Sequence, residues 1–408
     1  MSLHGKQNKR ILIISHFYYP DVTAAAFRIK ETADILSQMG FKVHVIAGEP
    51  HKGQVGNNTL DDGNIVVTRV PLIKYSGKGK WNYILHYLSF MFGAIYASWK
   101  HPSRFDIVWA TSPPLFTGIS GLAVSILKKA KYVLDIRDIW PESAVVAGQI
   151  SSTGLLFKAA KIVEKFLYNS ADYITCVAKP MAKYIASISS NSKTPTVIYN
   201  SIPQSMIENE TKDCISNKTD ILNILYIGNM GICQNLDLVL DAAKLLTSKG
   251  INNVKYTLVG KGTETEKLIN RVHSENIMNV EIKGIVPKSE AIHLIQTANA
   301  LMLHLKDDGT MNKTIPSKVF DYMAGGKPIL FGLKGEATEI LGSVSGNLYY
   351  DPASAEQLAN QSISLANNYT KLAKQAKQNK IKVKAEFTRE KMVERLADVF
   401  IEALKDKG

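Results

Sequence analysis

Short aliphatic runs alternate with longer helical patterns along this chain, and the alternation occurs twice. In the first half, Arg10–Ser15 is a continuous aliphatic run before a loop that contains proline, which is typical of a buried parallel strand. A helical pattern from Thr23 to Met39 follows and stops at Gly40, a residue type that commonly terminates helices. Alternating strands and helices predict a mostly parallel, doubly wound sheet.

A polar segment, Gln204–Asp220, interrupts the pattern, and we expect it to be a linker. The alternation then restarts with a predicted strand at Leu222–Gly228 and a predicted helix at Gln234–Ser248. Further predicted strands cover 41–47, 65–70, 105–111, 132–136, 173–177, 196–199, 254–259, 280–283, 300–305 and 328–331, and further predicted helices cover 264–276, 354–367 and 389–405. The 408 residues therefore predict two Rossmann-like domains, 1–203 and 204–385. Ligands of such sheets bind beyond the carboxyl ends of the strands, and with two halves those ends can face a cleft.

The composition fits a folded chain with anionic partners. Apolar residues make up 45% and charged residues 21%, which is ordinary for a globular protein. The formal net charge of +13 favours nucleic acid, acidic lipid or a phosphorylated small molecule, without choosing among them. Three cysteines in no CxxC pattern predict neither a disulfide framework nor a zinc site. The apolar run near the N-terminus is too short for a signal peptide, so we expect a cytoplasmic protein.

Two loops at predicted strand ends of the first half carry candidate catalytic side chains. Ser15–Thr23 contains His16 and leads into a helix, whose backbone N–H groups can meet a phosphate or an acceptor hydroxyl; an ordinary loop is the alternative. In Asp135–Glu142, Arg137 can hold an anionic group and Asp138 can accept a proton from an attacking hydroxyl. A structural ion pair is the alternative for this second loop.

The second half carries two glycine-rich turns at strand ends. Gly228–Gly231 closes the first predicted strand, and glycine there allows a diphosphate to approach the backbone. Val259–Gly262 can border a nucleobase or phosphate pocket, or can be a plain turn.

The strongest segment is Thr314–Pro328. Ser317 offers a hydroxyl and Lys318 an ammonium at the start of a predicted helix, where free N–H groups favour an anion. Asp321, three residues after Lys318, shares its helix face and suits a vicinal diol such as a ribose. The alternative is a capped helix packed on the sheet.

Residues Asn82–Trp99 form a strongly apolar helical segment. Basic residues flank it at Lys74, Lys78, Lys80, Lys100 and Arg104. Aromatic side chains with flanking lysines are typical of an interfacial site, but a helix half-buried against the sheet fits equally, and a spanning helix is the third alternative.

Taken together, these motifs resemble the family-4 retaining glycosyltransferases, and among them the bacterial capsule and O-antigen enzymes of the N-acetyl-L-fucosamine transferase type. The resemblance covers nearly the whole chain. Its carriers are His16–Pro20, Thr111–Pro114, Arg137–Glu142, Gly228–Gly231 with Gln234–Asp237, Val259–Gly262 and Pro316–Ala324 with Gly326–Pro328.

The resemblance implies an α/β fold of the GT-B type, in which two Rossmann-like doubly wound domains face a cleft and the helix at 386–408 packs back on the first. It implies retention of the anomeric configuration, no metal and no cofactor. Basic side chains and helix N-termini then stabilise the leaving diphosphate.

The resemblance also assigns roles to residues. It implies catalytic roles for Arg137, Asp138 and His16, donor-binding roles for Gly228, Asn229, Gly231, Gln234, Gly260, Gly262, Ser317, Lys318 and Asp321, and acceptor-side roles for Tyr19, Thr23, Arg28 and Glu142. Six positions depart from the family pattern. Asp321 stands in place of the second of two spaced glutamates, and Val22 and Thr23 stand in place of the glycine pair of the first loop. Lys313 replaces the first of two spaced glutamates, and Asn229 and Gln234 replace the usual arginine and lysine.

The implied function is transfer of an N-acetylated hexosamine or 6-deoxyhexosamine from a UDP-sugar to a polyprenyl-diphosphate-linked glycan, in bacterial surface polysaccharide synthesis. The implied partners are the nucleotide sugar, that acceptor and the inner face of the cytoplasmic membrane, with peripheral attachment and no nucleic acid. The alternatives are a UDP-sugar 2-epimerase of the same architecture and a non-catalytic protein that binds membrane or nucleic acid through its basic surface.

Overall fold

The computed structural model divides the chain into two compact units, which are described separately. The first comprises Met1–Ser143, Ile150–Asn200 and Arg389–Gly408, and the second comprises Ala144–Gln149 and Ser201–Thr388. The structure describes residues 9–21, 23–50, 59–62, 65–73, 80–148, 150–190, 193–208 and 221–406. The division falls within a few residues of the boundaries expected from sequence, whereas the grouping of Ala144–Gln149 with the second unit was not expected.

The first unit is built on an eight-stranded sheet with the order β3-β4-β2-β1-β5-β6-β7-β8. Its strands are β1 (Arg10–Ser15), β2 (Lys42–Gly48), β3 (Thr59–Asp62), β4 (Ile65–Val70), β5 (Ile107–Ser112), β6 (Lys131–Ile136), β7 (Tyr173–Cys176) and β8 (Thr196–Val197). Neighbouring strands are parallel except for β3, which runs antiparallel to β4. The predicted parallel sheet is therefore confirmed, while the short edge strand β3 was missed.

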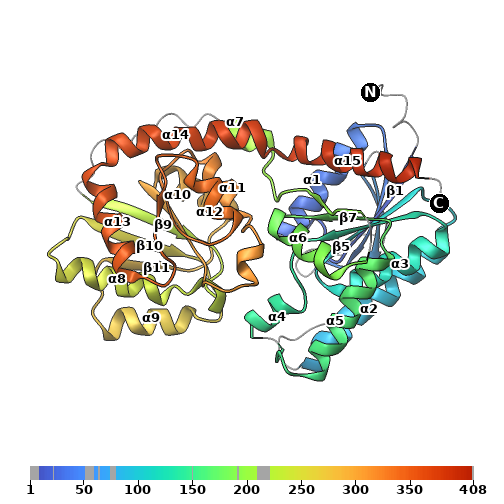
Figure 1. The fold of residues 1–408 in the computed structure, drawn as a ribbon, viewed down its shortest axis with the longest axis horizontal. Helices are drawn as coiled ribbons and strands as arrows, with labels where there is room; N and C mark the ends of the chain where they lie inside the picture. Colours follow the sequence, from blue (N-terminus) through green and yellow to red (C-terminus); the bar gives the residue numbers. More distant parts are fainter. Residues whose placement is uncertain are drawn as a thin grey trace. The chain divides into compact units, whose positions relative to one another are not determined.

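Helices cover both faces of this sheet, with α1 and α15 on one face and α2 and α3 on the other (Figure 1). The helices are α1 (Ala24–Gln38), α2 (Lys80–Lys100), α3 (Leu115–Lys128), α5 (Leu155–Ser170), α6 (Lys179–Ile188) and α15 (Arg389–Lys405), while α4 (Glu142–Val146) contains the boundary between the units. The predicted ends of α1 are confirmed: the Thr23 hydroxyl accepts a bond from Ala26 N at 3.1 Å, and Gly40 follows the helix with φ 93°.

The second unit has a six-stranded sheet with the order β11-β10-β9-β12-β13-β14. Its strands are β9 (Leu222–Ile227), β10 (Val254–Val259), β11 (Val280–Lys283), β12 (Ala300–His304), β13 (Ile329–Gly332) and β14 (Leu348–Tyr349), all parallel to their neighbours. The restart of the strand–helix pattern thus produces a second doubly wound sheet, as predicted.

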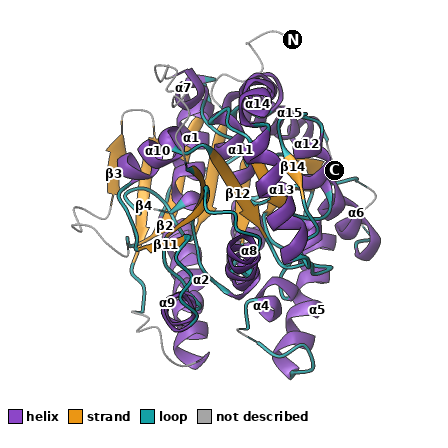
Figure 2. Ribbon diagram, turned by 90° about the vertical axis from the view of Figure 1, so that its left-hand side faces the viewer, coloured by secondary structure: helices purple, strands orange, loops and turns teal. Residues whose placement is uncertain are grey.

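Helices again lie on both faces, and Figure 2 shows β12 with α11 on one side and α8 on the other. They are α7 (Gln204–Glu208), α8 (Asp237–Ser248), α9 (Thr265–Ser274), α10 (Lys288–Thr297), α11 (Lys318–Ala324), α12 (Glu336–Gly342), α13 (Ala355–Asn367) and α14 (Tyr369–Glu386), with 3-10 turns η2 (Ile232–Gln234) and η3 (Met311–Lys313). Part of the predicted linker is the short helix α7, and residues 209–220 lie outside the described residues.

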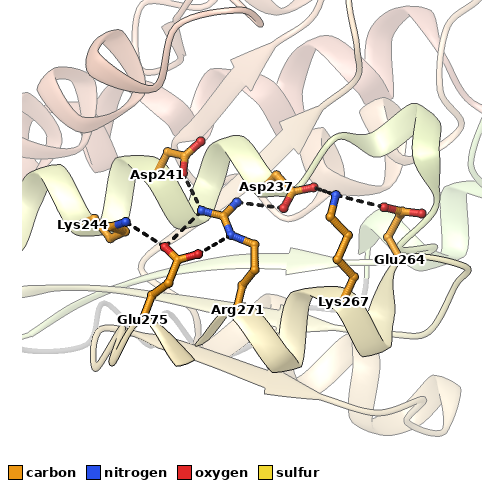
Figure 3. A network of polar contacts seen from close by, with 7 residues as sticks. All are labelled: Asp237, Asp241, Lys244, Glu264, Lys267, Arg271 and Glu275. Atoms are coloured by element: carbon orange, nitrogen blue, oxygen red, sulfur yellow. Dashed lines mark hydrogen bonds and ion pairs between the residues drawn. The ribbon is translucent and has the colours of Figure 1, made fainter. Parts of the chain in front are cut away.

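An ion-pair network joins α8 to α9 in the second unit (Figure 3). Arg271 donates to Asp237 and Asp241 of α8 at 2.8 and 2.7 Å, and its Nε donates to Glu275 at 2.7 Å. The remaining members are Lys244, Glu264 and Lys267. Helix α8 follows the turn Gly228–Gly231, and α9 follows the turn Val259–Gly262. The ion pairs between the two helices therefore help to fix the positions of the two turns relative to each other.

The apolar segment at 82–99 lies within helix α2, which packs against α3 and the sheet. In the part of the chain that the structure describes, no helix is both long and apolar enough to cross a membrane. The expected flanking residues Lys74 and Lys78 lie outside the described residues.

Candidate functional site

In the second unit, Lys318 extends its ammonium over Gly228, the residue that follows β9. A Cβ atom on Gly228 would lie 1.5 Å from Lys318 Nζ and 2.2 Å from its Cε, and the Gly228 φ angle is 154°. Glycine is therefore required at this position for the ammonium to reach the strand end. Two residues that were predicted separately as donor contacts are thus brought together.

Tyr226, near the end of β9, contacts the Lys318 ammonium. Lys318 Nζ lies 3.5 Å from the Tyr226 hydroxyl and 4.9 Å from the centre of its ring. The Tyr226 hydroxyl in turn donates a 2.5 Å bond to the carbonyl of Asn229. Burial lowers the pKa of Lys318 to about 8, although the Asp321 carboxylate opposes this shift. An ammonium with so little water around it binds an incoming anion strongly, because the two charges are weakly screened.

Tyr322 fixes helix α11 relative to β9. Its buried hydroxyl accepts a bond from Ile227 N at 2.9 Å and lies 3.2 Å from the Ile227 carbonyl, to which it can donate. Tyr322 and Lys318 belong to the same short helix. The hydrogen bonds between Tyr322 and Ile227 therefore fix the position of Lys318 relative to β9. Sequence reasoning missed both Tyr226 and Tyr322; the available signal was a tyrosine at the strand end and another inside the strongest motif.

The two glycine-rich turns pack against each other through their backbones. A Cβ atom on Gly260 would lie 1.9 Å from Gly228 O, and one on Gly262 would lie 2.3 Å from Met230 O. Gly228 N also donates to Val259 O at 2.8 Å. The second turn therefore acts as a support for the first, which explains its glycines without a direct ligand contact.

Asn229 and Gln234 are engaged within the first turn. Gln234 Oε1 accepts from Gly231 N at 3.0 Å and from Asn229 Nδ2 at 3.2 Å. Neutral amides therefore hold the turn where the family pattern places cations. Lys318 is a cation that lies against this turn.

A cavity of about 880 Å³ opens beside Lys318 and lies wholly within the second unit. Ile227, Lys318 and Asp321 are among the lining residues, together with residues of α10, α11 and α14. Its volume is in the range of small-molecule sites. Asp321, whose side chain is exposed, shares this lining with Lys318, whereas Ser317 is exposed just before the helix and is not among the described residues that line the cavity.

The N-terminus of helix α11 has fewer free backbone N–H donors than expected. Helix α11 has only seven residues, and the Val319 and Phe320 N–H groups already bond to Pro316 O and Ser317 O at 3.0 and 3.2 Å. The expected set of free helix N–H donors is thus reduced, and the anion-binding capacity rests mainly on the Lys318 ammonium.

In the first unit, the structure corrects the expectation for Arg28. Its guanidinium forms a bidentate pair with the fully buried Asp135, at 2.7 and 3.3 Å, and Thr175 adds a 2.8 Å bond to the same carboxylate. Burial alone would raise the pKa of Asp135, but the Arg28 charge and these hydrogen bonds outweigh it and lower the pKa. Arg28 therefore lies in the core instead of on an acceptor side, because a buried carboxylate must be paired.

Arg137 and Asp138 follow β6 and are half-buried. Burial raises the pKa of the Asp138 carboxyl, and the neighbouring Arg137 charge opposes the shift. A carboxylate with a raised pKa is a better proton acceptor, and the catalytic role of this pair stays a prediction.

His16 lies directly after β1, is buried, and faces a second buried histidine. Its Nε2 lies 3.1 Å from Nε2 of His86 on α2, and His86 Nδ1 lies 2.7 Å from the Ile73 carbonyl. Since a carbonyl only accepts, His86 Nδ1 carries a proton. With both rings neutral, His86 Nε2 is then the acceptor and His16 Nε2 the donor. His86 was not predicted, because nothing local in α2 distinguishes it from a core residue.

The remaining acceptor-side candidates have structural partners. Thr23 caps α1, and the Tyr19 carbonyl accepts a bond from Arg69, while the Tyr19 side chain is exposed. Glu142 accepts from Lys161 Nζ at 2.8 Å and from the Tyr184 hydroxyl at 3.0 Å. The Tyr19 side chain is thus the exposed aromatic group of this set, while the bonds of Glu142 involve only one of its two carboxylate oxygens.

No group of three or more histidine, cysteine, aspartate or glutamate side chains that could hold a metal ion occurs among the described residues.

Each half of the chain matches a known protein-domain model. The Glycosyl transferase 4-like domain matches residues 23–201, and the Glycosyl transferases group 1 model matches residues 208–383. The chain is 23% identical over 348 residues to the colanic acid biosynthesis glycosyl transferase WcaI of Escherichia coli (strain K12), an alignment that covers 79% of this chain and 83% of WcaI. It is 21% identical over 209 residues to the glycosyltransferase WbjE of Pseudomonas aeruginosa, covering 49% of this chain and only half of WbjE. Both relatives carry provisional names.

Solved structures share the fold at low identity. The sucrose-phosphate synthase of Thermosynechococcus elongatus superposes with a TM-score of 0.73 at 14% identity, covering 97% of this chain and 99% of that one. HepE of Anabaena in complex with UDP and glucose also gives 0.73, at 13% identity over 97% of this chain and 100% of that one. WaaG, a glycosyltransferase of lipopolysaccharide biosynthesis, gives 0.70 at 11% identity, covering 96% and 99%. With one glycosyltransferase domain model matched to each half of the chain and two doubly wound sheets of the GT-B fold, the comparisons support a glycosyltransferase whose residues 208–383 match the group 1 model.

Proposed function

We propose that this glycosyltransferase moves an N-acetylated hexosamine or 6-deoxyhexosamine from a UDP-sugar to a polyprenyl-diphosphate-linked glycan, with retention of configuration and without a metal. The observation that carries the proposal is the Lys318 ammonium held over Gly228, in a side chain that lines a cavity together with Asp321. A cation beside a carboxylate matches a nucleotide, because the diphosphate needs positive charge and the ribose diol needs an acceptor.

Structural neighbours support the nucleotide part of this proposal. Structures of HepE from Anabaena hold UDP, UDP with glucose, and UDP-glucose. In the proposed complex, Lys318 contacts the diphosphate and Asp321 the ribose. The Gly228–Gly231 turn, stiffened by Gln234 and by Gly260 and Gly262, lets the diphosphate approach the backbone.

The proposed reaction forms a bond between an acceptor oxygen and C1 of the donor sugar while the bond from C1 to the β-phosphate oxygen breaks. UDP leaves with the electron pair of that bond, and attack on the face from which it departs retains the configuration. The hydroxyl proton passes to Asp138 or to His16, and Arg137 balances the negative charge that develops.

The proposed setting is bacterial surface polysaccharide synthesis at the cytoplasmic face of a membrane, with peripheral attachment. Support comes from the name of WcaI, which refers to colanic acid biosynthesis, and from that of WaaG, which refers to lipopolysaccharide biosynthesis.

The test has two arms. In the first, a panel of nucleotide sugars is screened for a rise in Tm, since a ligand that binds the folded state raises it. In the second, the donor that shifts Tm is incubated with a polyprenyl-diphosphate-sugar, and UDP release and the extended glycan are measured. No UDP release with any donor and acceptor refutes the transferase proposal.

Two controls separate the alternatives. Formation of an epimer from the nucleotide sugar without acceptor identifies a 2-epimerase instead. Asp138→Asn tests the acceptor side: we expect kcat to fall by about 100-fold while the Kd for UDP stays within about twofold, because only proton transfer is lost. An unchanged kcat removes Asp138 from the proposed reaction.

A further inference from the structure

Three neighbouring helices of the first unit expose apolar side chains to an unusual extent. Helix α3 packs against both α2 and α5 (Figure 1). The large apolar side chains that these helices expose are Leu85, Phe92, Tyr96, Trp99, Ile126, Leu127, Leu155, Leu156, Ile162 and Phe166. We call this set the α2–α3–α5 surface. Clusters of this kind on a folded protein mark a site of interaction.

Helix α5 has two apolar faces, and one of them is exposed. Leu167 and Tyr168 are buried on the inner face. On the outer face, Leu155, Ile162 and Phe166 are 84%, 72% and 56% exposed. Their spacing of seven and four residues puts them on one stripe of the helix. An apolar stripe of this spacing in a globular protein normally packs against another apolar surface. The outer face of α5 is therefore expected to have a binding partner.

Helix α2 repeats the arrangement with aromatic residues. Phe92, Tyr96 and Trp99 are 63%, 54% and 63% exposed and fall on one face, opposite the buried Phe90 and Ala94. Lys100 places its ammonium 4.7 Å from the centre of the Tyr96 ring. Tryptophan and tyrosine beside lysine are the residues that favour the boundary between lipid headgroups and acyl chains.

Charge decides between the partners that could cover this surface. In all three helices the one acidic residue is Glu164, which is fully buried and bonded to Lys161. The basic residues of the three helices are Lys80, Lys100, Lys128, Lys158, Lys161 and Lys165. A two-fold contact with a second copy would bring this positive surface against itself, which is unfavourable. An acidic membrane surface complements both the apolar and the basic parts.

We propose that the α2–α3–α5 surface binds the headgroup region of an anionic phospholipid bilayer, with the aromatic and aliphatic side chains inserted and the lysines at the phosphates. The proposal rests on the proposed function, because a lipid-linked acceptor is presented at such a bilayer. It specifies the attachment site as three helices, whereas the sequence alone pointed to α2.

Vesicle flotation of the full chain tests the proposal. Vesicles of phosphatidylcholine alone are compared with vesicles that contain phosphatidylglycerol, at low and high salt. We expect binding to the anionic vesicles that weakens as salt rises, because the lysine contribution is screened. Absence of binding to anionic vesicles overturns the proposal.

Paired substitutions locate the surface. Ile162→Gln with Phe166→Gln removes the stripe on α5, and we expect at least a tenfold lower partition coefficient on anionic vesicles. Lys158→Glu with Lys165→Glu should lower it by about fivefold per lysine removed, or more, because acidic side chains repel the same surface. If both paired variants bind vesicles as the wild type does, the α5 part of the surface is wrong.

A matched control uses exposed apolar residues of the second unit. Ile221 and Met278 are 51% and 89% exposed and lie outside the α2–α3–α5 surface. Ile221→Gln with Met278→Gln should leave vesicle binding unchanged, and equal loss in this control overturns the assignment. Unchanged Tm and UDP affinity in all variants show that folding and the donor site are intact.

The outcomes separate this proposal from the transferase proposal. UDP binding without vesicle binding refutes the membrane proposal and leaves the transferase proposal standing. Vesicle binding without nucleotide-sugar binding refutes the transferase proposal and leaves the membrane proposal standing. If the α5 variant converts a dimer to a monomer in solution and vesicles are not bound, the surface is a contact between copies, and the membrane proposal falls.

Discussion

Replacing Lys318 by methionine should weaken UDP binding and stabilise the folded protein at the same time. The two effects have one cause, the poor solvation of the ammonium over Gly228. Burial lowers the pKa of Lys318 from 10.5 to about 8. The charge is therefore unfavourable in the empty site, while it is available to an anionic ligand. Methionine keeps most of the volume of the side chain and removes the charge.

The binding loss follows from the interaction removed. A hydrogen bond between a charged donor and a charged acceptor contributes about 1.5–3 kcal/mol. At about 1.4 kcal/mol per factor of ten, Lys318→Met should raise the Kd for UDP by about 10- to 150-fold.

The pH dependence has a defined sign. Below pH 8 the wild-type ammonium is charged in the empty site, so UDP affinity should not depend on this group. As pH rises above 8 the empty site loses its proton, and the Kd should increase by up to about tenfold per pH unit. The methionine variant should show no such dependence.

The stability effect runs in the opposite direction. The folded-state pKa of Lys318 is depressed, so the unfolded chain binds its proton more tightly and the ammonium destabilises the folded state at pH values below about 8. Wild-type stability should therefore rise between pH 8 and 10.5. The difference between 10.5 and about 8 corresponds to at most about 3 kcal/mol, which the methionine variant recovers at pH 7.

Isothermal titration calorimetry with UDP from pH 6.5 to 9.5, together with denaturant unfolding, measures both effects. Lys334 provides the matched control, because its ammonium also contacts a tyrosine of the same unit, at 3.0 Å from the Tyr349 hydroxyl, but its side chain is 33% exposed and does not line the cavity. Lys334→Met should leave UDP affinity unchanged. Equal UDP affinity in wild type and Lys318→Met, or an equal loss in both variants, would refute the reasoning.

Three further predictions follow from the described contacts. Gly228→Ala should raise the Kd for UDP by about tenfold or more, measured by calorimetry, because the new Cβ would displace the ammonium above it; an unchanged Kd contradicts the steric argument. His86→Leu should lower kcat by about tenfold and alter its pH profile while the Kd for UDP is kept, because His16 Nε2 loses its acceptor; an unaltered pH profile makes the contact merely structural. Arg271→Met should lower Tm by a few degrees at pH 7 but by less near pH 2, since Arg271 holds the pKa of Glu275 at about 2 and that stabilisation is lost as pH falls from 4.5; calorimetric scans showing the same difference at both pH values would disprove it.

Local patterns predicted most of the fold. The aliphatic run at Arg10–Ser15 and the alternation around it are properties of neighbouring residues, and they predicted most strands of both sheets, although the two-residue strand β14 and helix α12 were missed. The edge strand Thr59–Asp62 was missed because it is short and polar, and its pairing with β4 comes from the sheet and not from its own sequence. The cap at Thr23 and the stop at Gly40 were readable because helix ends depend on a few adjacent residues.

The motifs also predicted which segments of the second unit gather at the strand ends, since Gly228 and Lys318 both follow from the topology of a parallel sheet. The roles of single side chains were harder to predict. Arg28 was expected on an acceptor side, whereas it neutralises Asp135, 107 residues away in the chain, inside the core. Gln234 was expected at the donor and instead holds its own turn.

By itself, the sequence determined the number of units, the parallel sheets and the loops where chemistry is possible, because periodicity and turn residues act over a few positions. Only the tertiary structure decided that Lys318 lies over Gly228, that His16 faces His86, and that the outer faces of α2 and α5 are left uncovered together. The first two relations join residues 90 and 70 positions apart, and whether such side chains meet depends on sheet register and helix packing, which no local pattern encodes.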